Sequence, residues 1–324
     1  MIVELLDHPV IAERYFFPRP DRVADPTWID AGGARLACYR TPSPPDDAAW
    51  LVHFHGNGEV AADWLDDFAR PLERRGHAVL LAEYRGYGGS SGAPGLRSML
   101  DDALACVDAT GALASRIVAY GRSVGSIFAL HAAAHRALGG LVVESGIADV
   151  LERLALRLTP RELGTDAAGL AAAVRADLDH EAKLAAYAGP VLVLHARRDH
   201  MVAPSHATRL AGWAGARAEL RLFDRGDHNS IFAFNGQAIL DAVSAQLDRA
   251  QEVTHGSALR RDHPVRARRV PEARRAPARG VDHRAGAARA GADLGGAHRR
   301  PLLEHARRQD RRGAARRRRA RRRA

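Results

Sequence analysis

Short apolar runs recur along the first 250 positions and alternate with longer stretches of helical periodicity. Runs of about five residues that are bounded by glycine, proline and polar residues are typical of strands buried on both faces. Residues 1–30 contain no such run, so we expect an irregular lead-in with Tyr15 to Pro18 packed on the sheet edge. The strands that we expect are Ala34–Arg40, Trp50–Phe54, Ala78–Ala82, Arg116–Tyr120, Leu141–Glu144, Val191–His195 and Glu219–Phe223.

Between these runs, apolar residues follow the spacing of a helix. Residues 148–188 are rich in Ala, Leu and Arg with this spacing, which predicts a small helical cap inserted between two strands. Strands that alternate with helices predict an α/β fold, with a mostly parallel central sheet and helices on both faces. In such sheets the ligand site lies at the carboxyl ends of the strands. The other helices that we expect are Val60–Arg75, Leu96–Val107, Ser126–Ala134, Pro204–Trp213 and Ile231–Leu247.

Charge divides the chain into two parts. The formal net charge of +10 is misleading, because residues 251–324 hold 23 Arg and 7 acidic residues, whereas residues 1–250 carry a net charge of −6. Residues 1–250, which we expect to form the folded domain, are therefore mildly acidic and give no indication of phosphate binding. Residues 251–324 have no lysine and no periodic apolar face. We expect this Arg/Ala-rich tail to be disordered.

The composition of this tail has two interpretations. A polybasic arm that contacts nucleic acid or an anionic membrane is one. The other is a GC-rich gene translated out of frame, because Arg, Ala, Gly and Pro codons are all GC-rich. We favour the frameshift, since evolved basic tails usually contain lysine and this one has none. Contact with nucleic acid or membrane through the tail is therefore not expected.

Several sequence features concern redox state, location and cofactors. The two cysteines, Cys38 and Cys106, stand in apolar surroundings and are too few for a disulfide framework, so we expect buried thiols. The N-terminus lacks the basic start and apolar core of a signal peptide, and no run approaches the roughly 18 apolar residues of a membrane span. A cytoplasmic location is the resulting expectation. No paired-Cys or His-Glu-x-x-His spacing occurs, so we expect neither a metal nor an organic cofactor.

The strongest chemical signal is Gly121-Arg122-Ser123-Val124-Gly125, which follows a predicted strand and precedes a predicted helix. A G-x-S-x-G sequence in that context is typical of a nucleophile elbow, a tight turn that presents the serine hydroxyl at the end of a sheet. The glycines allow the strand and helix backbones to approach closely. Ser123 is therefore the candidate nucleophile.

A serine hydroxyl needs a base to take its proton and an acid to orient that base. His228 lies after the last predicted strand and before the final helix, which makes it the best candidate base. Asp199 follows the preceding strand and gives the chain order Ser, Asp, His that this architecture uses. The alternative for Asp199 is a solvated loop aspartate paired with Arg197 or Arg198. Glu144, at the end of another predicted strand, is the second candidate acid.

Acyl transfer also needs N–H donors where negative charge develops. The backbone N–H of Val124, directly after Ser123, is one candidate. The second is expected from His55-Gly56-Asn57-Gly58, the turn after an early strand, where the Asn57 N–H can point inward. An ordinary strand-to-helix turn would contain the same glycines for steric reasons.

These motifs, together with Tyr84–Gly92 and Gly226–Asn229, resemble α/β-hydrolases over about residues 8–250. More narrowly, the chain is similar to the branch of BEM46-like proteins and ABHD13- and ABHD17-type serine hydrolases, near the serine aminopeptidase-like group. The resemblance implies the α/β-hydrolase fold, Ser123, Asp199 and His228 as nucleophile, acid and base, and Asn57 and Val124 as oxyanion donors. The pocket residues that it implies are His55, Gly56, Gly58, Tyr84, Arg85 and Arg122.

The sequence therefore predicts a serine hydrolase that acts on ester, thioester or amide bonds of a small-molecule or acyl substrate through an acyl-enzyme. The alternatives are a catalytically silent binding module of the same fold and a serine aminopeptidase-like peptidase. Substrate identity, acyl chain length and oligomeric state are left open by the sequence.

Overall fold

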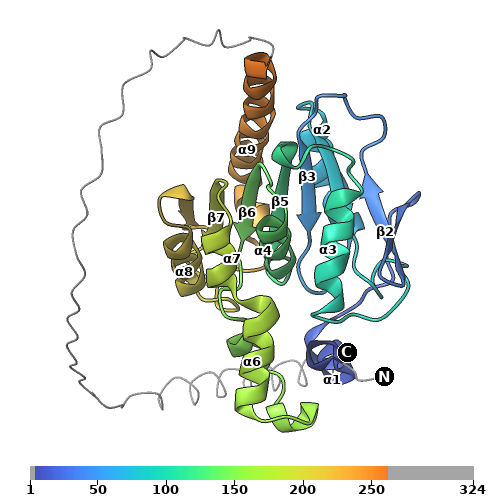
Figure 1. The fold of residues 1–324 in the computed structure, drawn as a ribbon, viewed down its shortest axis with the longest axis vertical. Helices are drawn as coiled ribbons and strands as arrows, with labels where there is room; N and C mark the ends of the chain where they lie inside the picture. Colours follow the sequence, from blue (N-terminus) through green and yellow to red (C-terminus); the bar gives the residue numbers. More distant parts are fainter. Residues whose placement is uncertain (1–3, 262–324) are drawn as a thin grey trace, which may run out of the picture. The chain divides into compact units, whose positions relative to one another are not determined.

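A mixed β-sheet forms the centre of the fold. The computed structural model describes residues 4–261, with side chains up to residue 252. Within these residues, eight strands form one sheet in the order β1-β2-β4-β3-β5-β6-β7-β8 (Figure 1). Strands β3 to β8 run parallel, so their carboxyl ends share one edge of the sheet, and β1 and β2 are antiparallel additions. The strands are β1 (Thr27–Ala31), β2 (Ala34–Arg40), β3 (Trp50–Phe54), β4 (Ala78–Ala82), β5 (Ile117–Arg122), β6 (Gly140–Glu144), β7 (Val191–Ala196) and β8 (Ala218–Phe223).

Helices cover both faces of this sheet. Helices α3, α4 and α8 pack on one face, and α2 and α9 pack on the other. Helices α5, α6 and α7 lie between β6 and β7 in the chain and fill the segment where a helical cap is expected. The helices are α1 (Pro9–Tyr15), α2 (Arg70–Glu73), α3 (Ser98–Asp108), α4 (Gly125–His135), α5 (Val150–Ala155), α6 (Ala167–Leu178), α7 (His180–Ala186), α8 (Pro204–Ala214) and α9 (Ile231–Arg261).

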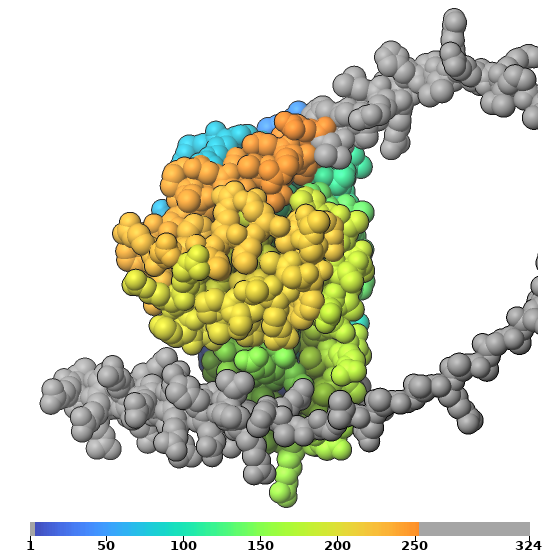
Figure 2. All heavy atoms as spheres, turned by 90° about the vertical axis from the view of Figure 1, so that its left-hand side faces the viewer, coloured from blue at the N-terminus to red at the C-terminus, as the bar shows by residue number. Residues whose placement is uncertain are grey.

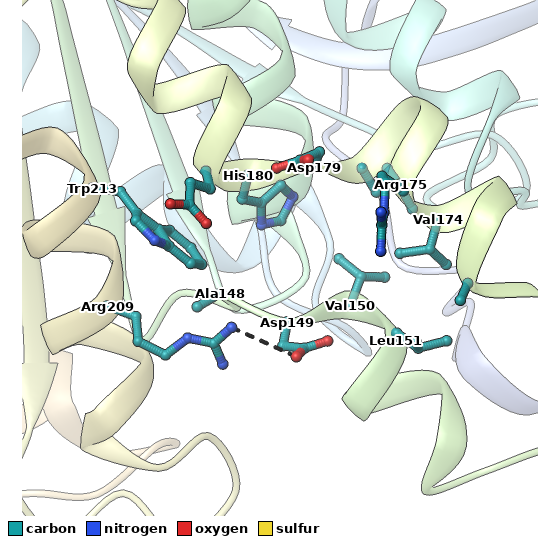
Figure 3. A pocket seen from close by; sticks show the side chains of 13 residues that line it. Ala148, Asp149, Val150, Leu151, Val174, Arg175, Asp179, His180, Arg209 and Trp213 are labelled. Carbon is teal, nitrogen blue, oxygen red and sulfur yellow. Dashed lines mark ion pairs between the residues drawn. The ribbon is translucent and has the colours of Figure 1, made fainter. Parts of the chain in front are cut away.

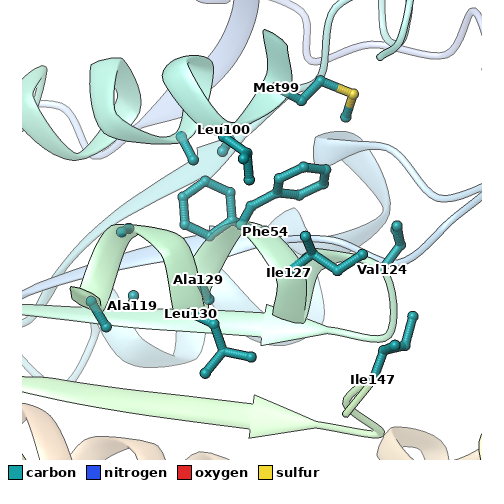
Figure 4. Packing of buried hydrophobic residues seen from close by; sticks show 14 of the residues in the cluster. Phe54, Met99, Leu100, Ala119, Val124, Ile127, Ala129, Leu130 and Ile147 are labelled. Atoms are coloured by element: carbon teal, nitrogen blue, oxygen red, sulfur yellow. The ribbon is translucent and has the colours of Figure 1, made fainter. Parts of the chain in front are cut away.

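The two faces of the sheet have separate hydrophobic cores. On β3, Phe54 belongs to the core under α3 and α4, whereas Leu51, three residues earlier on the same strand, belongs to the core under α9. Figure 4 shows the first core, where Phe54 lies between the two helices and close to Ile127. Strands buried on both faces are apolar at every position, which is why these runs were recognisable. The expected thiols Cys38 and Cys106 are confirmed as free and buried.

The expectation of an irregular lead-in is wrong. Helix α1 begins with Pro9 at its first position, and the Nδ1 of His8 accepts a hydrogen bond from the Val10 N–H at 3.2 Å. Strand β1 follows and pairs with β2. Along β1, exposed and buried residues alternate from Trp28 to Ala31, as in an edge strand with one solvated face. Alternation over five residues is a weaker signal than a continuous apolar run, so β1 escaped recognition.

Two further helix predictions need correction. The stretch Val60–Arg75 is three short elements, a 3-10 turn (Ala61–Trp64), a π turn (Leu65–Ala69) and α2. Helix α9 starts at Ile231 as expected but continues to Arg261 instead of ending near Leu247. The expected domain boundary at residue 250 therefore falls inside α9, and the rest of the predicted tail lies outside the described residues.

Helix α9 packs on the sheet face over β5, β6 and β7, next to α2. Figure 2 shows the described unit from its β8 side, where the yellow residues of α8 and β8 border the orange residues of α9. No helix within residues 4–261 is both long enough and apolar enough to cross a bilayer.

Candidate active site

The turn between β5 and α4 holds Ser123 in a strained conformation. Its φ of +52° lies in the left-handed region that residues with a Cβ rarely adopt. The Ser123 N–H donates to the carbonyl of Glu144 on the adjacent strand at 2.9 Å, which ties the turn to the sheet. The side chain is 8% exposed and stands at the carboxyl end of β5. This is the geometry of a nucleophile elbow.

Both motif glycines are required by close backbone contacts. A Cβ on Gly121 would lie 2.5 Å from the carbonyl oxygen of Gly125, and a Cβ on Gly125 would lie 2.0 Å from the carbonyl oxygen of Phe54. Real Cβ atoms do not approach backbone oxygen this closely, so β5, β3 and α4 would have to move apart. The glycines are therefore part of what allows the turn to form.

We expect Gly125→Ala to lower the free energy of unfolding by about 3 kcal/mol, as for an overpacked core site. Gly212→Ala is the matched control, because Gly212 lies exposed inside α8 and a Cβ added there would have no atom within 4 Å. That variant should gain about 0.5–1 kcal/mol through helix propensity. Urea unfolding followed by circular dichroism measures both changes, and equal stability of the two variants would contradict the steric argument.

The structure brings Ser123, His228 and Asp199 into one hydrogen-bonded chain. The Nε2 of His228 lies 2.9 Å from the Ser123 Oγ, and its Nδ1 lies 2.7 Å from the Asp199 Oδ2. Because a carboxylate only accepts, Nδ1–H donates to Asp199 and Nε2 is left to accept the serine proton. All three side chains are buried and come from the carboxyl ends of β5, β7 and β8. The arrangement can move a proton from serine to histidine.

Asp199 is held as a carboxylate by its loop. Its Oδ1 accepts the N–H groups of Met201 and Val202 at 2.9 and 2.8 Å. Burial alone would raise the pKa of Asp199, but the hydrogen bonds and the charge of His228 outweigh it and hold that pKa below its usual value. Asp199 is buried and Arg197 pairs with Asp224 at 2.9 Å, so the structure does not contain the alternative, a solvated loop aspartate paired with Arg197 or Arg198.

Glu144, the second candidate acid, has other partners. Its Oε1 accepts from Arg122 Nε at 3.0 Å and its Oε2 from the Tyr120 hydroxyl. Both carboxylate oxygens of Glu144 therefore already accept hydrogen bonds from other side chains. The imidazole of His228 is bonded to Asp199 instead. Geometry separates the two candidate acids where the sequence left both open.

The expected oxyanion donors lie on the loops that flank Ser123. Val124 directly follows the serine, and within residues 4–261 its N–H has no protein acceptor. The side chain of Asn57 faces the N-terminal segment, where its Oδ1 accepts from the Phe17 N–H and the Tyr87 hydroxyl, each at 3.0 Å. The Asn57 side chain therefore fixes its loop, and the backbone N–H of Asn57 has no protein acceptor among the described residues.

The loop residues His55 and Tyr84 are buried under the site instead of lining an open pocket. The Nε2 of His55 lies 2.9 Å from Glu83, and its Nδ1 lies 2.8 Å from the Gly56 carbonyl. Burial opposes the charged imidazolium, yet the Glu83 carboxylate outweighs it and raises the pKa of His55. Tyr84 donates its hydroxyl proton to the His55 carbonyl at 2.7 Å. These side chains brace the loop from below, and Gly58, at φ +80°, turns it.

The two expected pocket arginines have different surroundings. Arg85 forms a fork with Asp102 on α3, at 2.6 Å from its Nε, and its Nη2 donates to the Ala31 carbonyl. It therefore joins helix and sheet instead of facing Ser123. Arg122 is buried and donates to Glu144, to Glu59 and to the carbonyl of His228. Sequence reasoning missed Glu59 and Glu83, because a single acidic residue after a glycine-rich turn or after an apolar run carries no distinctive signal.

A pocket of about 270 Å³ lies between the cap helices and α8, and Ser123, His228 and Asp199 are not among its lining residues. It is bounded by α5, α6, α7 and α8, and Figure 3 shows Trp213 and His180 on one side and Val150 and Leu151 on the other. An ion pair of 3.6 Å between Arg209 and Asp149 crosses its rim. Ser123, Asp199 and His228 do not line it, so the cap helices form a hollow of their own.

Comparison with known proteins gives a family match and several curated relatives. Residues 45–165 match the family described as serine aminopeptidase, S33. The uncharacterized protein YfhR of Escherichia coli K12 is 26% identical over 247 residues, which cover 69% of this chain and 83% of that protein. The human α/β hydrolase domain-containing protein 17B is 24% identical over 204 residues, covering 61% of this chain and 67% of that protein.

Solved structures extend the likeness across the described fold. Est1E from Butyrivibrio proteoclasticus, solved with ferulic acid bound, superimposes with a TM-score of 0.57 at 20% identity, covering 68% of this chain and 99% of that chain. A hydrolase from Pseudomonas aeruginosa gives a TM-score of 0.54 at 23% identity, covering 70% and 99%. At these identities the likeness shows a shared fold.

Proposed function

We propose that this chain, a member of the α/β-hydrolase superfamily near the serine aminopeptidase-like group, is a serine hydrolase that works through an acyl-enzyme. The observation that carries the proposal is the continuous chain of hydrogen bonds from Ser123 through His228 to Asp199, at 2.9 and 2.7 Å. Its substrates would be carboxylic esters, thioesters or amides.

In the proposed mechanism each of the three residues takes one part. As the Ser123 Oγ attacks the carbonyl carbon, His228 Nε2 takes the hydroxyl proton, and the Asp199 carboxylate stabilises the imidazolium that results. The tetrahedral oxyanion would be met by the backbone N–H groups of Val124 and Asn57. His228 then returns the proton to the leaving group, and an acyl-serine remains. Water repeats the sequence with His228 again as base, which releases the acid and restores the serine.

A serine aminopeptidase-like peptidase is the second candidate. The observation that favours it is the match of residues 45–165 to the serine aminopeptidase family. A peptidase of that kind needs a site that binds the free amine of its substrate. An esterase that acts on alkyl esters needs no such site. The two candidates therefore differ in substrate and not in the chemistry at Ser123.

A substrate panel decides between the candidates. We expect hydrolysis of p-nitrophenyl esters, measured by p-nitrophenolate release over a series of acyl chain lengths. Aminoacyl anilides assayed beside them should have a kcat/KM at least about 100-fold lower. Their amide bond has a poorer leaving group than the p-nitrophenyl ester, and an esterase has no site that binds their free amine. Faster turnover of the anilides would support the peptidase. No turnover of either substrate, with no labelling by a fluorophosphonate, would leave a binding module of the same fold.

A further inference from the structure

The guanidinium of Arg122 contacts three segments that are distant in the chain. Its Nε donates to Glu144 on β6 at 3.0 Å, its Nη1 donates to Glu59, and its Nη2 donates to the carbonyl of His228 at 2.6 Å. Arg122 is 4% exposed, so water does not replace these contacts. A planar fork that is permanently charged is suited to three fixed acceptors at once.

Glu59 carries this network to the loop that holds Asn57. Its Oε2 accepts the N–H of Gly56 at 2.7 Å and the Nε1–H of Trp64 at 3.1 Å, while its other oxygen meets Arg122. A Cβ on Gly56 would lie 2.5 Å from Arg122 Nη1, so the loop passes directly over the guanidinium. The position of the loop and the position of Arg122 are therefore coupled.

The same arginine fixes the backbone of the candidate base. Asp199 holds the ring of His228 by a single hydrogen bond. The ring could still shift together with its loop if the main chain were not held as well. The bond from Arg122 Nη2 to the His228 carbonyl supplies that second attachment, and charge-assisted bonds of this kind are stronger than neutral ones. Since Arg122 directly precedes Ser123, one residue connects the serine turn, the histidine loop and the Asn57 loop.

We propose that Arg122 is a positioning residue, which holds the His228 backbone and the 55–58 loop in register with Ser123. The inference rests on the proposed serine hydrolase function. Without the guanidinium, two carboxylates and a carbonyl lose their shared donor, and the serine–histidine distance and the oxyanion loop loosen together. Displacement of about 1 Å at such a site costs about 100-fold in rate. Arg122 acts through these groups and does not contact the acyl group.

The experiment compares Arg122→Gln and Arg122→Lys with Arg217→Gln in the full chain. Arg217 is the matched control, because it also donates to buried carbonyls, those of Tyr187 and Leu184, but it precedes β8 at the end of the sheet opposite the site. The first readout is the second-order rate and the final extent of fluorophosphonate labelling. The second is the split between kcat and KM on a p-nitrophenyl ester.

For Arg122→Gln we expect kcat and the labelling rate to fall by about 100-fold, with KM within about threefold and labelling that still runs to completion. Arg122→Lys keeps the charge between the two glutamates and should lose less, about 10-fold. Arg217→Gln should keep its labelling rate within about twofold, even where its melting temperature falls.

Two results would overturn the inference. One is an Arg122→Gln variant that labels as fast as the Arg217→Gln control. The other is a variant that labels at the wild-type rate but to a reduced extent, because a smaller folded fraction indicates a role in stability alone. Failure of the wild-type chain to label is a different outcome, which would contradict the serine hydrolase proposal itself.

Discussion

Ser123→Ala should remove ester hydrolysis, with kcat falling by about 10⁶-fold. The loss follows because the Ser123 Oγ is the atom that bonds to the acyl carbon in the proposed mechanism. It is hydrogen-bonded to His228 at 2.9 Å, and His228 is bonded to Asp199 at 2.7 Å. The fold should persist, since alanine keeps the Cβ and so meets the same strain at φ +52° as serine does. A fluorophosphonate probe should label the wild-type chain at this residue, which peptide mass spectrometry identifies, and should leave the variant unlabelled.

Ser145→Ala provides a matched control for this substitution. Ser145 is also a buried serine with a positive φ, +48°, at the end of the neighbouring strand, and its Oγ has no hydrogen-bond partner among the described residues. We expect the Ser145→Ala chain to be labelled like the wild type. Equal labelling of the Ser123→Ala chain would remove Ser123 from the mechanism.

Much of the fold was predictable because the parallel strands β3 to β7 are buried on both faces. Continuous apolar runs such as Ala78–Ala82 need no knowledge of neighbouring strands, and each proved to be a strand with the expected bounds or within one or two residues of them. The α/β-hydrolase fold is confirmed on this basis. The misses share a cause. Strand β1 and the turns that replace the Val60–Arg75 helix depend on tertiary contacts for their form, and periodicity does not report those contacts.

The candidate site was predictable where chemistry follows a strand directly. Ser123, Asp199 and His228 each lie in a loop after a parallel strand, so their meeting at one edge follows from topology. Side-chain direction does not follow from topology. Arg85 turns toward α3 and Arg122 turns inward, although both were expected at the pocket.

Long-range partners were the hardest feature to foresee. The acceptors of Arg122 include Glu59 and the His228 carbonyl, which lie 63 and 106 residues away in the chain. Nothing in the sequence near either residue marks it as a partner of a buried cation. Such contacts become visible only when the strands are placed side by side.

Asp199→Asn should lower kcat by about 10⁴-fold. An amide at this position can donate to Nδ1, which favours the histidine tautomer whose Nε2 carries a proton and therefore cannot accept one from Ser123. The imidazolium that forms during attack would also lose its carboxylate, the group whose pKa is held below its usual value in the folded protein. Steady-state kinetics on the best p-nitrophenyl ester gives the loss, and KM should change far less than kcat.

Glu144→Gln is the informative comparison, because Glu144 is the other carboxylate that the sequence offered as the orienting acid. Glutamine keeps an oxygen that can accept from Arg122 Nε, so we expect a loss below about 10-fold in kcat, together with a lower melting temperature from the weakened buried ion pair. The ratio of the two losses tests the assignment. A larger loss of kcat for Glu144→Gln than for Asp199→Asn would mean that the 2.7 Å contact between His228 and Asp199 is not the one that orients the base.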